Sequence, residues 1–215
     1  MLSVIEEEVN LLRGRTDRLV IGGMSQGMAM ALWTHLCGVG RVGTTDTRCW
    51  GPFAAFFGIC GWLPFSNEVS KAIEVIDDDN TEDARQPGAH GKENVAANVM
   101  SVVDAVRGRV GNHNDSTAKS SKSGNPKTLN AIAKTEGPKS LRSTPIFLCH
   151  GRDDLVVDVS LGQEASQLLT RTGAEVEWKV HTVGTAKESG AHWIAEPEGF
   201  DDLVCFLEKC TTARR

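Results

Sequence analysis

The chain has 215 residues, which is enough for one domain with a sizeable core. Its 40% hydrophobic and 24% charged residues are ordinary for a soluble globular protein, and its formal charge of −5 argues against nucleic acid as the main partner, because nucleic-acid-binding domains usually carry a basic face. The N-terminus contains three consecutive glutamates, and no apolar run reaches the roughly 18 residues of a membrane span, so we expect a soluble, cytoplasmic protein without a signal peptide.

Helical and strand-like segments alternate along the chain. The N-terminal segment has apolar residues at helical spacing, namely Val4, Ile5, Val9 and Leu12. In chain order we predict a helix over 3–13, a buried strand over 18–23, a helix over 24–37 closed by Gly38, strands over 54–60 and 145–149, a helix over 160–170, a strand over 176–181 and a helix over 200–210. This alternation predicts a single α/β domain over 1–215 with a mainly parallel, doubly wound sheet.

Residues 77–143 interrupt that rhythm. The segment opens with the acidic run IDDDNTED and continues into a stretch rich in Ser, Lys, Gly and Asn. Only residues 95–106 have helical apolar spacing. Such a composition cannot bury enough apolar surface to offset the entropy of ordering, so we expect a flexible surface insertion.

The pentapeptide Gly23-Met24-Ser25-Gln26-Gly27 is a G-x-S-x-G motif between a predicted strand and a predicted helix. That setting is what a nucleophile elbow requires, because a tight strand-to-helix turn lifts the serine hydroxyl above the edge of the sheet. Small flanking residues let the strand and the helix approach closely. We therefore predict Ser25 as a nucleophile, with the backbone N–H of Gln26 as one oxyanion donor.

A nucleophilic serine needs a histidine base, and the base needs an acid that orients it. In α/β-hydrolases the chain order is serine, acid, histidine, each on a loop after a strand. Asp153 and Asp154 both follow the predicted strand over 145–149, and spacing alone does not choose between them. Asp158 is better placed to cap the next helix. The base is expected after the last strand, where His192 lies.

The other histidines fit the role of the base less well. His181 lies inside a predicted strand, His35 lies in the helix after the elbow, and His150 adjoins the acid loop, which we expect it to shape. His90 and His113 lie in the predicted insertion.

Six cysteines are scattered along the chain and never form a C-x-x-C pair. Metal-binding cysteines usually come in close pairs, and secreted disulfide scaffolds are short and cysteine-dense. We therefore expect buried free thiols in a reducing compartment, with no metal site. The six are Cys37, Cys49, Cys60, Cys149, Cys205 and Cys210.

Four sequence blocks together resemble the acyl-protein thioesterases of the phospholipase/carboxylesterase branch of the α/β-hydrolases. They are IGGMSQGMAMAL around Ser25, GICGWLPF at 58–65, PIFLCHGRDDLVV at 145–157 and GAHWIAEPEGFDDLVCFL at 190–207. The H-G-x-x-D block selects Asp154 as the acid, and His192 matches the histidine of the family. The resemblance implies hydrolysis of esters or thioesters without a cofactor.

Substrates and their binding residues are also implied by this resemblance. They would be acylated proteins, small acyl esters or lysophospholipids, with transient contact to a membrane surface as a further expectation. Trp62 and Leu63 of the W-L-P block would line an acyl channel, although ordinary core packing explains the aromatic residues of this region equally well.

The sequence also departs from the family pattern. Leu155 and Asp158 stand where relatives commonly carry prolines, which would loosen the acid loop. The H-G-x-G-D segment, which supplies the second oxyanion donor in the family, is not found, and only one helix precedes the elbow. We therefore expect a fold that lacks its N-terminal strands. An incomplete sequence, completion of the sheet by another chain and loss of catalysis all remain open, the last leaving an acyl- or protein-binding module.

Overall fold

A computed structural model describes residues 2–38, 52–79, 143–184 and 190–212 of the chain. Four strands form one sheet in the order β1-β2-β3-β4, and every neighbouring pair is parallel. The strands are β1 (Val20–Met24), β2 (Ala55–Ile59), β3 (Ile146–Gly151) and β4 (Val176–His181). The predicted α/β class and parallel sheet are therefore confirmed.

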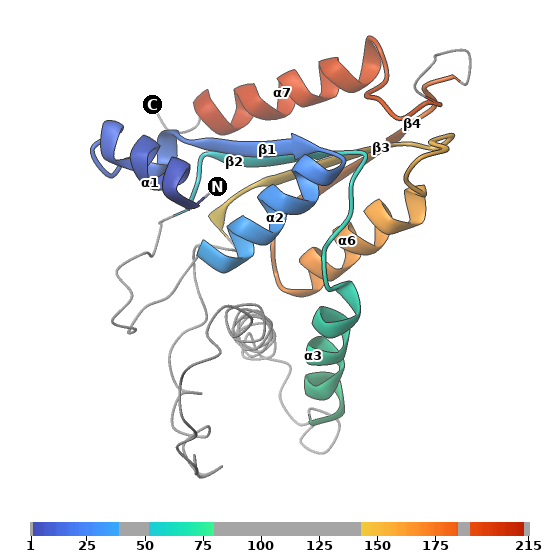
Figure 1. Ribbon diagram of the computed structural model, residues 1–215, viewed down its shortest axis with the longest axis horizontal. Helices are drawn as coiled ribbons and strands as arrows, with labels where there is room; N and C mark the ends of the chain where they lie inside the picture. The colour runs from blue at the N-terminus through green and yellow to red at the C-terminus, as the bar shows by residue number, and fades with distance from the viewer. Residues whose placement is uncertain (1, 39–51, 80–142, 185–189, 213–215) are drawn as a thin grey trace, which may run out of the picture.

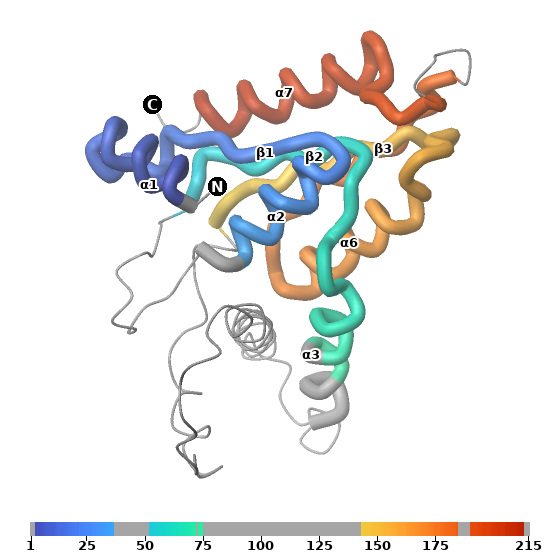
Figure 2. Tube along the Cα trace, viewed as in Figure 1, coloured from blue at the N-terminus to red at the C-terminus, as the bar shows by residue number. Residues whose placement is uncertain are grey.

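The helices lie on both faces of this sheet (Figure 1). Helices α2 (Gln26–Gly38) and α6 (Val159–Arg171) cover one face, and α7 (Glu198–Thr212) covers the other. Helix α3 (Ser66–Asp79) lies beyond α6 on the first face, and α1 (Leu2–Leu11) lies beside the start of β1. Figure 2 shows that α1 and the final turns of α7 are at the end of the sheet opposite the β1–α2 turn.

Alternating side chains of the central strands build two separate cores. In β3, Ile146 and Leu148 pack toward α2 and α6, whereas Phe147 and Cys149 pack toward α7. Because successive side chains of a strand point to opposite faces, a strand buried on both sides is apolar throughout. This explains why the run PIFLC shows no alternation with polar residues.

Helix α6 begins where the sequence places its cap. The Oδ1 of Asp158 accepts a hydrogen bond of 2.8 Å from the N–H of Ser160, which satisfies one of the free donors in the first turn. The predicted capping role of Asp158 is confirmed.

Some details of the sequence interpretation were wrong. Val4 is 58% exposed instead of belonging to the buried face of α1, which packs through Ile5 and Val9. Helix α3 was not predicted and includes the residues 77–79 assigned to the insertion; its signal was the four-residue spacing of the buried Val69 and Ile73. The rest of the predicted insertion, apart from residue 143, lies outside the described residues.

The cysteine expectation was correct in part. Cys60 and Cys149 are buried free thiols, whereas Cys205 is exposed and Cys210 is half-buried. Burial raises the pKa of Cys60 to about 11 and that of Cys149 to about 12. Both buried thiols are therefore in the protonated form at neutral pH. Cys49 and the side chain of Cys37 lie outside the described residues.

Candidate active site

Ser25 forms the turn between β1 and α2. Its φ of 55° lies in the left-handed region that non-glycine residues seldom occupy, and such strain is typical of functional turns. Two backbone hydrogen bonds hold the turn: the N–H of Ser25 donates to the carbonyl of Ile59 at 2.8 Å, and the N–H of Ala29 donates to the carbonyl of Ser25 at 3.1 Å. The turn is thus fixed to both β2 and α2.

Glycines allow the close approach that this turn needs. A Cβ at Gly23 would lie 2.4 Å from the carbonyl carbon of Gly27, so the last residues of the strand touch the backbone of the first helical turn. A Cβ at Gly61 would lie 2.8 Å from the carbonyl oxygen of Ser25. These contacts are with backbone, which cannot move aside as a flexible side chain would.

We expect Gly23→Ala to lower the free energy of unfolding by about 1–3 kcal/mol, because the new methyl group must push α2 away from β1. Gly27→Ala is the matched control, since a Cβ at Gly27 meets nothing within 4 Å and alanine favours the helix. Urea titration of both variants measures the difference. Equal stability of the two variants would contradict this account of the turn.

The carboxylate of Asp154 follows β3 and is surrounded by donors. Its side chain is 0% exposed. Oδ1 accepts the backbone N–H groups of Val156 at 2.8 Å and Val157 at 3.0 Å, and Oδ2 lies 2.8 Å from Nδ1 of His192. Burial by itself would raise the pKa of Asp154, but the hydrogen bonds from Val157, His192 and Val156 outweigh it and hold the pKa below its ordinary value. The acid is therefore ionised at neutral pH.

Asp153 has a different set of partners. Its Oδ1 and Oδ2 accept the backbone N–H groups of Val183 at 2.9 Å and Gly184 at 2.7 Å, just after β4. The hydrogen bond from Val183 is the largest cause of a lowered pKa at Asp153. Asp153 thus anchors the loop after β4, and the structure places Asp154, not Asp153, against His192.

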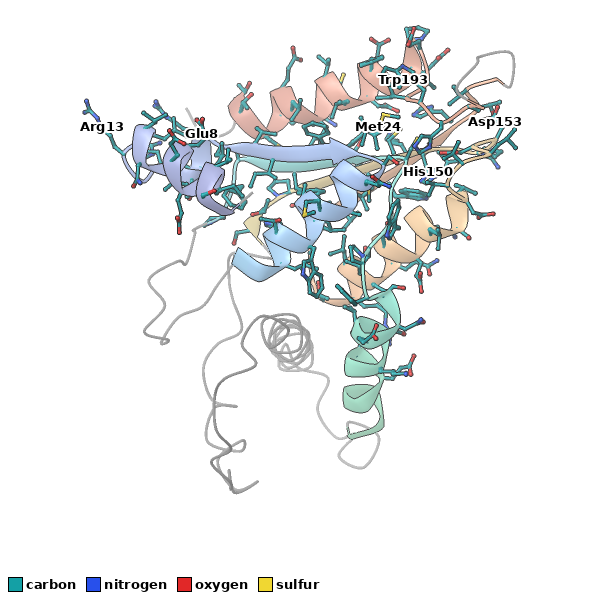
Figure 3. All side chains as sticks on the ribbon, viewed as in Figure 1. Glu8, Arg13, Met24, His150, Asp153 and Trp193 are labelled. Carbon is teal, nitrogen blue, oxygen red and sulfur yellow. The ribbon has the colours of Figure 1, made fainter. Side chains whose placement is uncertain are left out.

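The acid loop and the histidine loop are also joined through their backbones. The N–H of Leu155 donates to the carbonyl of Gly190 at 3.0 Å. Gly190 and Ala191 have φ of 59° and 61°, which turns the chain just before His192. Figure 3 shows Met24, His150, Asp153 and Trp193 at the same end of the sheet. The elbow, the acid loop and the histidine loop therefore meet where the parallel strands end.

Cys60 lies beside this cluster at the end of β2, and its Sγ lies 3.4 Å from the carbonyl oxygen of Trp193. Single ligand atoms of Cys60, His150 and Asp154 fall within 4.8 Å of one another. Each of them already takes part in a hydrogen bond, and the thiol of Cys60 resists the deprotonation that metal binding requires. We assign the three residues to a hydrogen-bonded network.

The remaining predicted site residues lie on this side of the molecule or in its core. Gln26 is the first residue of α2 and is exposed. Leu63 is 3% exposed and packs in the core with Met28, whereas Trp62 is half-buried. A cavity of about 310 Å³ lies at the start of β3 and β4, at the other end of the sheet from Ser25.

The strand order and the loop positions define the class of protein. The crystal structure of Arabidopsis thaliana SOBER1 superposes on the chain with a TM-score of 0.52 at 16% identity, covering 97% of this chain and 60% of that one. The described residues thus form part of an α/β-hydrolase fold. The crystal structure of Zea mays acyl-protein thioesterase 2 gives a TM-score of 0.48 at 20% identity over 90% of this chain and 56% of that one.

The sequence comparisons match part of the chain. Residues 125–210 match the family model described as Phospholipase/Carboxylesterase. Acyl-protein thioesterase 1 of Gibberella zeae is 32% identical over 68 residues, which is 32% of this chain and 26% of that protein. The resemblance to the phospholipase/carboxylesterase family is therefore confirmed. The chain spans less than two thirds of the length of these relatives. None of the described helices is long and apolar enough to cross a membrane.

Proposed function

We propose that the chain carries the catalytic triad of a serine hydrolase that cleaves carboxylic esters or thioesters, with Ser25 as nucleophile, His192 as base and Asp154 as acid. The observation that carries this proposal is the 2.8 Å contact between His192 and a fully buried, ionised Asp154 at the end of the sheet where Ser25 forms a strained turn. The family match supports the same chemistry.

In this proposal the geometry of the histidine decides the direction of proton transfer. Nδ1 of His192 is hydrogen-bonded to the carboxylate of Asp154, so Nδ1 carries a proton. Nε2 is the nitrogen left to accept the proton of the Ser25 hydroxyl. Ser25 attacks the acyl carbon, and His192 returns the proton to the leaving alcohol or thiol. Water, deprotonated by His192, then attacks the acyl-enzyme and releases the carboxylic acid, and Ser25 regains its proton from His192. Asp154 stabilises the imidazolium and does not take up the proton.

The N-terminus of α2 supports the developing oxyanion. The N–H of Gln26 immediately follows Ser25 and lies in the first turn of a 13-residue helix, whose dipole favours negative charge there. In the described sheet β1 is an edge strand, with a hydrogen-bonded neighbour on one side only. This observation favours a second candidate function, an acyl- or protein-binding module, because an unpaired strand edge is a template for pairing with another chain.

Within this proposal the substrates are acylated proteins, small acyl esters or lysophospholipids in the cytoplasm, with transient contact to a membrane surface and without a cofactor. The name of the Gibberella zeae relative supports the thioester class. Trp62, half-buried next to Gly61 and close to the Ser25 turn, is the residue we propose for acyl contact.

Covalent labelling with a fluorophosphonate probe separates the two candidate functions. We expect the purified chain to be labelled and Ser25→Ala to be unlabelled, because the probe phosphonylates an activated serine. Ser160→Ala is the control, since this exposed serine lies on α6 away from the turn. A folded wild-type chain that is not labelled would favour the binding module.

A further inference from the structure

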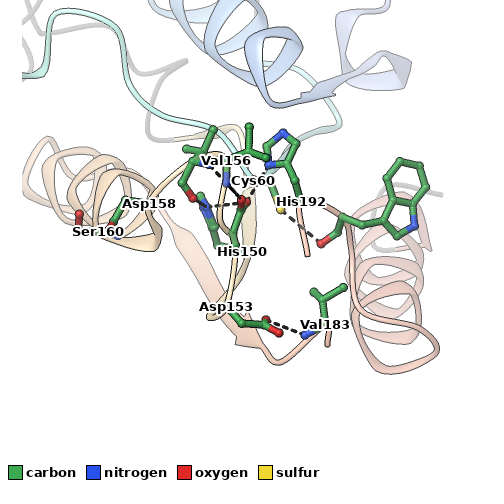
Figure 4. A network of polar contacts seen from close by, with 11 residues as sticks. Cys60, His150, Asp153, Val156, Asp158, Ser160, Val183 and His192 are labelled. Atoms are coloured by element: carbon green, nitrogen blue, oxygen red, sulfur yellow. Dashed lines mark hydrogen bonds and ion pairs between the residues drawn. The ribbon is translucent and has the colours of Figure 1, made fainter. Parts of the chain in front are cut away.

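His150 is a buried histidine in contact with the proposed acid. It lies in β3 with 1% of its side chain exposed. Its Nε2 is 3.0 Å from the carbonyl oxygen of Val157 and 3.3 Å from Oδ2 of Asp154, the same oxygen that holds His192. In Figure 4 the dashed contacts of His150, His192 and the backbone of Val156 converge on the carboxylate oxygens between them.

The surroundings of the ring fix which nitrogen carries the hydrogen. Both atoms near Nε2 are oxygen acceptors, so the neutral ring must present N–H there. Its other nitrogen, Nδ1, faces α6 at Gly162, where an added Cβ would lie only 2.5 Å from it. Nδ1 has no hydrogen-bond partner among the described residues. The Nε2–H tautomer therefore donates to the carbonyl of Val157 at 3.0 Å, and Oδ2 of Asp154 lies 3.3 Å from the same nitrogen as a longer polar contact.

This N–H lies beside the donors that surround the acid. An ionised carboxylate offers about four lone-pair sites. Oδ1 of Asp154 uses two for the N–H groups of Val156 and Val157, and Oδ2 faces His192 and His150. The carboxylate cannot rotate about its Cβ–Cγ bond without losing one of its three hydrogen bonds in a buried place, and the His150 ring stands against Oδ2 on that side.

We propose that His150 is a positioning residue of the active site, whose Nε2–H donates to Val157 while lying against Oδ2 of Asp154, and so keeps Oδ2 aimed at His192. The proposal rests on the function proposed above and adds a residue to its machinery. His150 does not touch the reacting atoms. Its contact with Val157 also closes the turn whose N–H groups bind the other carboxylate oxygen, so one side chain restrains both halves of the carboxylate.

A matched pair of variants tests the donor. His150→Gln retains an N–H at a similar distance from the backbone, whereas His150→Met has the same chain length and no donor. We expect His150→Met to lower kcat about 10- to 100-fold with little change in KM, because a misplaced base slows chemistry and leaves substrate contacts intact. His150→Gln should recover most of the loss. His181→Met serves as control, because His181 is a half-buried histidine that contacts Asp202 of α7.

Proton NMR provides a readout that does not depend on turnover. The Nδ1–H of His192 in its hydrogen bond to Asp154 gives a separate downfield resonance, which we expect to move or broaden in His150→Met and to stay near its wild-type position in His150→Gln and His181→Met. A folded wild-type chain that the fluorophosphonate probe does not label contradicts the proposed function. If the wild-type chain is labelled by the fluorophosphonate but folded His150→Met keeps its kcat and its resonance, the role of His150 is overturned. An equal loss of kcat in His150→Gln and His150→Met also overturns it.

Discussion

Asp154→Asn should lower kcat by about 10⁴, the loss typical when a triad acid becomes an amide. Oδ2 of Asp154 lies 2.8 Å from Nδ1 of His192 and keeps the hydrogen on that nitrogen. An asparagine that turns its NH₂ group toward Nδ1 would hold the opposite tautomer, with the hydrogen on Nε2, where it cannot accept the serine proton. The measurement is kcat on a soluble thioester or ester, with circular dichroism to show that the variant is folded.

Asp153→Asn is the matched control, because it makes the same replacement of a carboxylate by an amide at the neighbouring residue. Its carboxylate binds the backbone N–H groups of Val183 and Gly184, and the amide oxygen of asparagine can keep one of them. We expect stability to fall slightly and kcat to stay within a few fold of the wild type. A reversed pattern, with Asp153→Asn inactive and Asp154→Asn active, would show that the acid was assigned to the wrong residue.

The choice between these two acids shows how far the sequence can lead. Strand periodicity places a pair of aspartates after β3, because parallel strands end at a common edge, but neighbouring residues in a loop have no fixed direction. Only the resemblance to a family favoured Asp154. In the structure the N–H groups of Val156 and Val157 turn back onto that carboxylate, a local fold that no spacing in the sequence indicates.

Elements with a strong local signal were predicted well. The strand over Val176–His181 has the predicted bounds, and the cap at Asp158 begins α6 as expected. Long-range contacts were harder to foresee. The sharing of Asp154 by His150 and His192, which are 42 positions apart, depends on how two loops meet in space. A sequence pattern of a few residues cannot encode such a meeting.

The burial of His35, which lies in α2 as predicted, is a second feature that the sequence analysis did not foresee. Its side chain is 0% exposed, and neither ring nitrogen has a hydrogen-bond partner among the described residues. The ring lies 5.5 Å from that of Phe53 and 5.8 Å from that of Phe56, measured between centroids. Burial lowers the pKa of His35 from 6.5 to about 4. An ionisable group is thus held neutral in an aromatic core.

The stability of the fold should therefore fall in mild acid. Between pH 6.5 and about 4 the unfolded chain binds a proton at His35 and the folded chain does not, so lowering the pH favours unfolding over this range. The difference between the two pKa values corresponds to about 3 kcal/mol of free energy of unfolding. This stability is lost progressively below pH 6.5, and the loss is complete near pH 4. Urea titrations at pH 7 and pH 4.5 should show most of this loss in the wild type and a much smaller loss in His35→Leu, which has no group to protonate. If both proteins lose the same free energy of unfolding, other residues cause the acid sensitivity and the buried histidine does not.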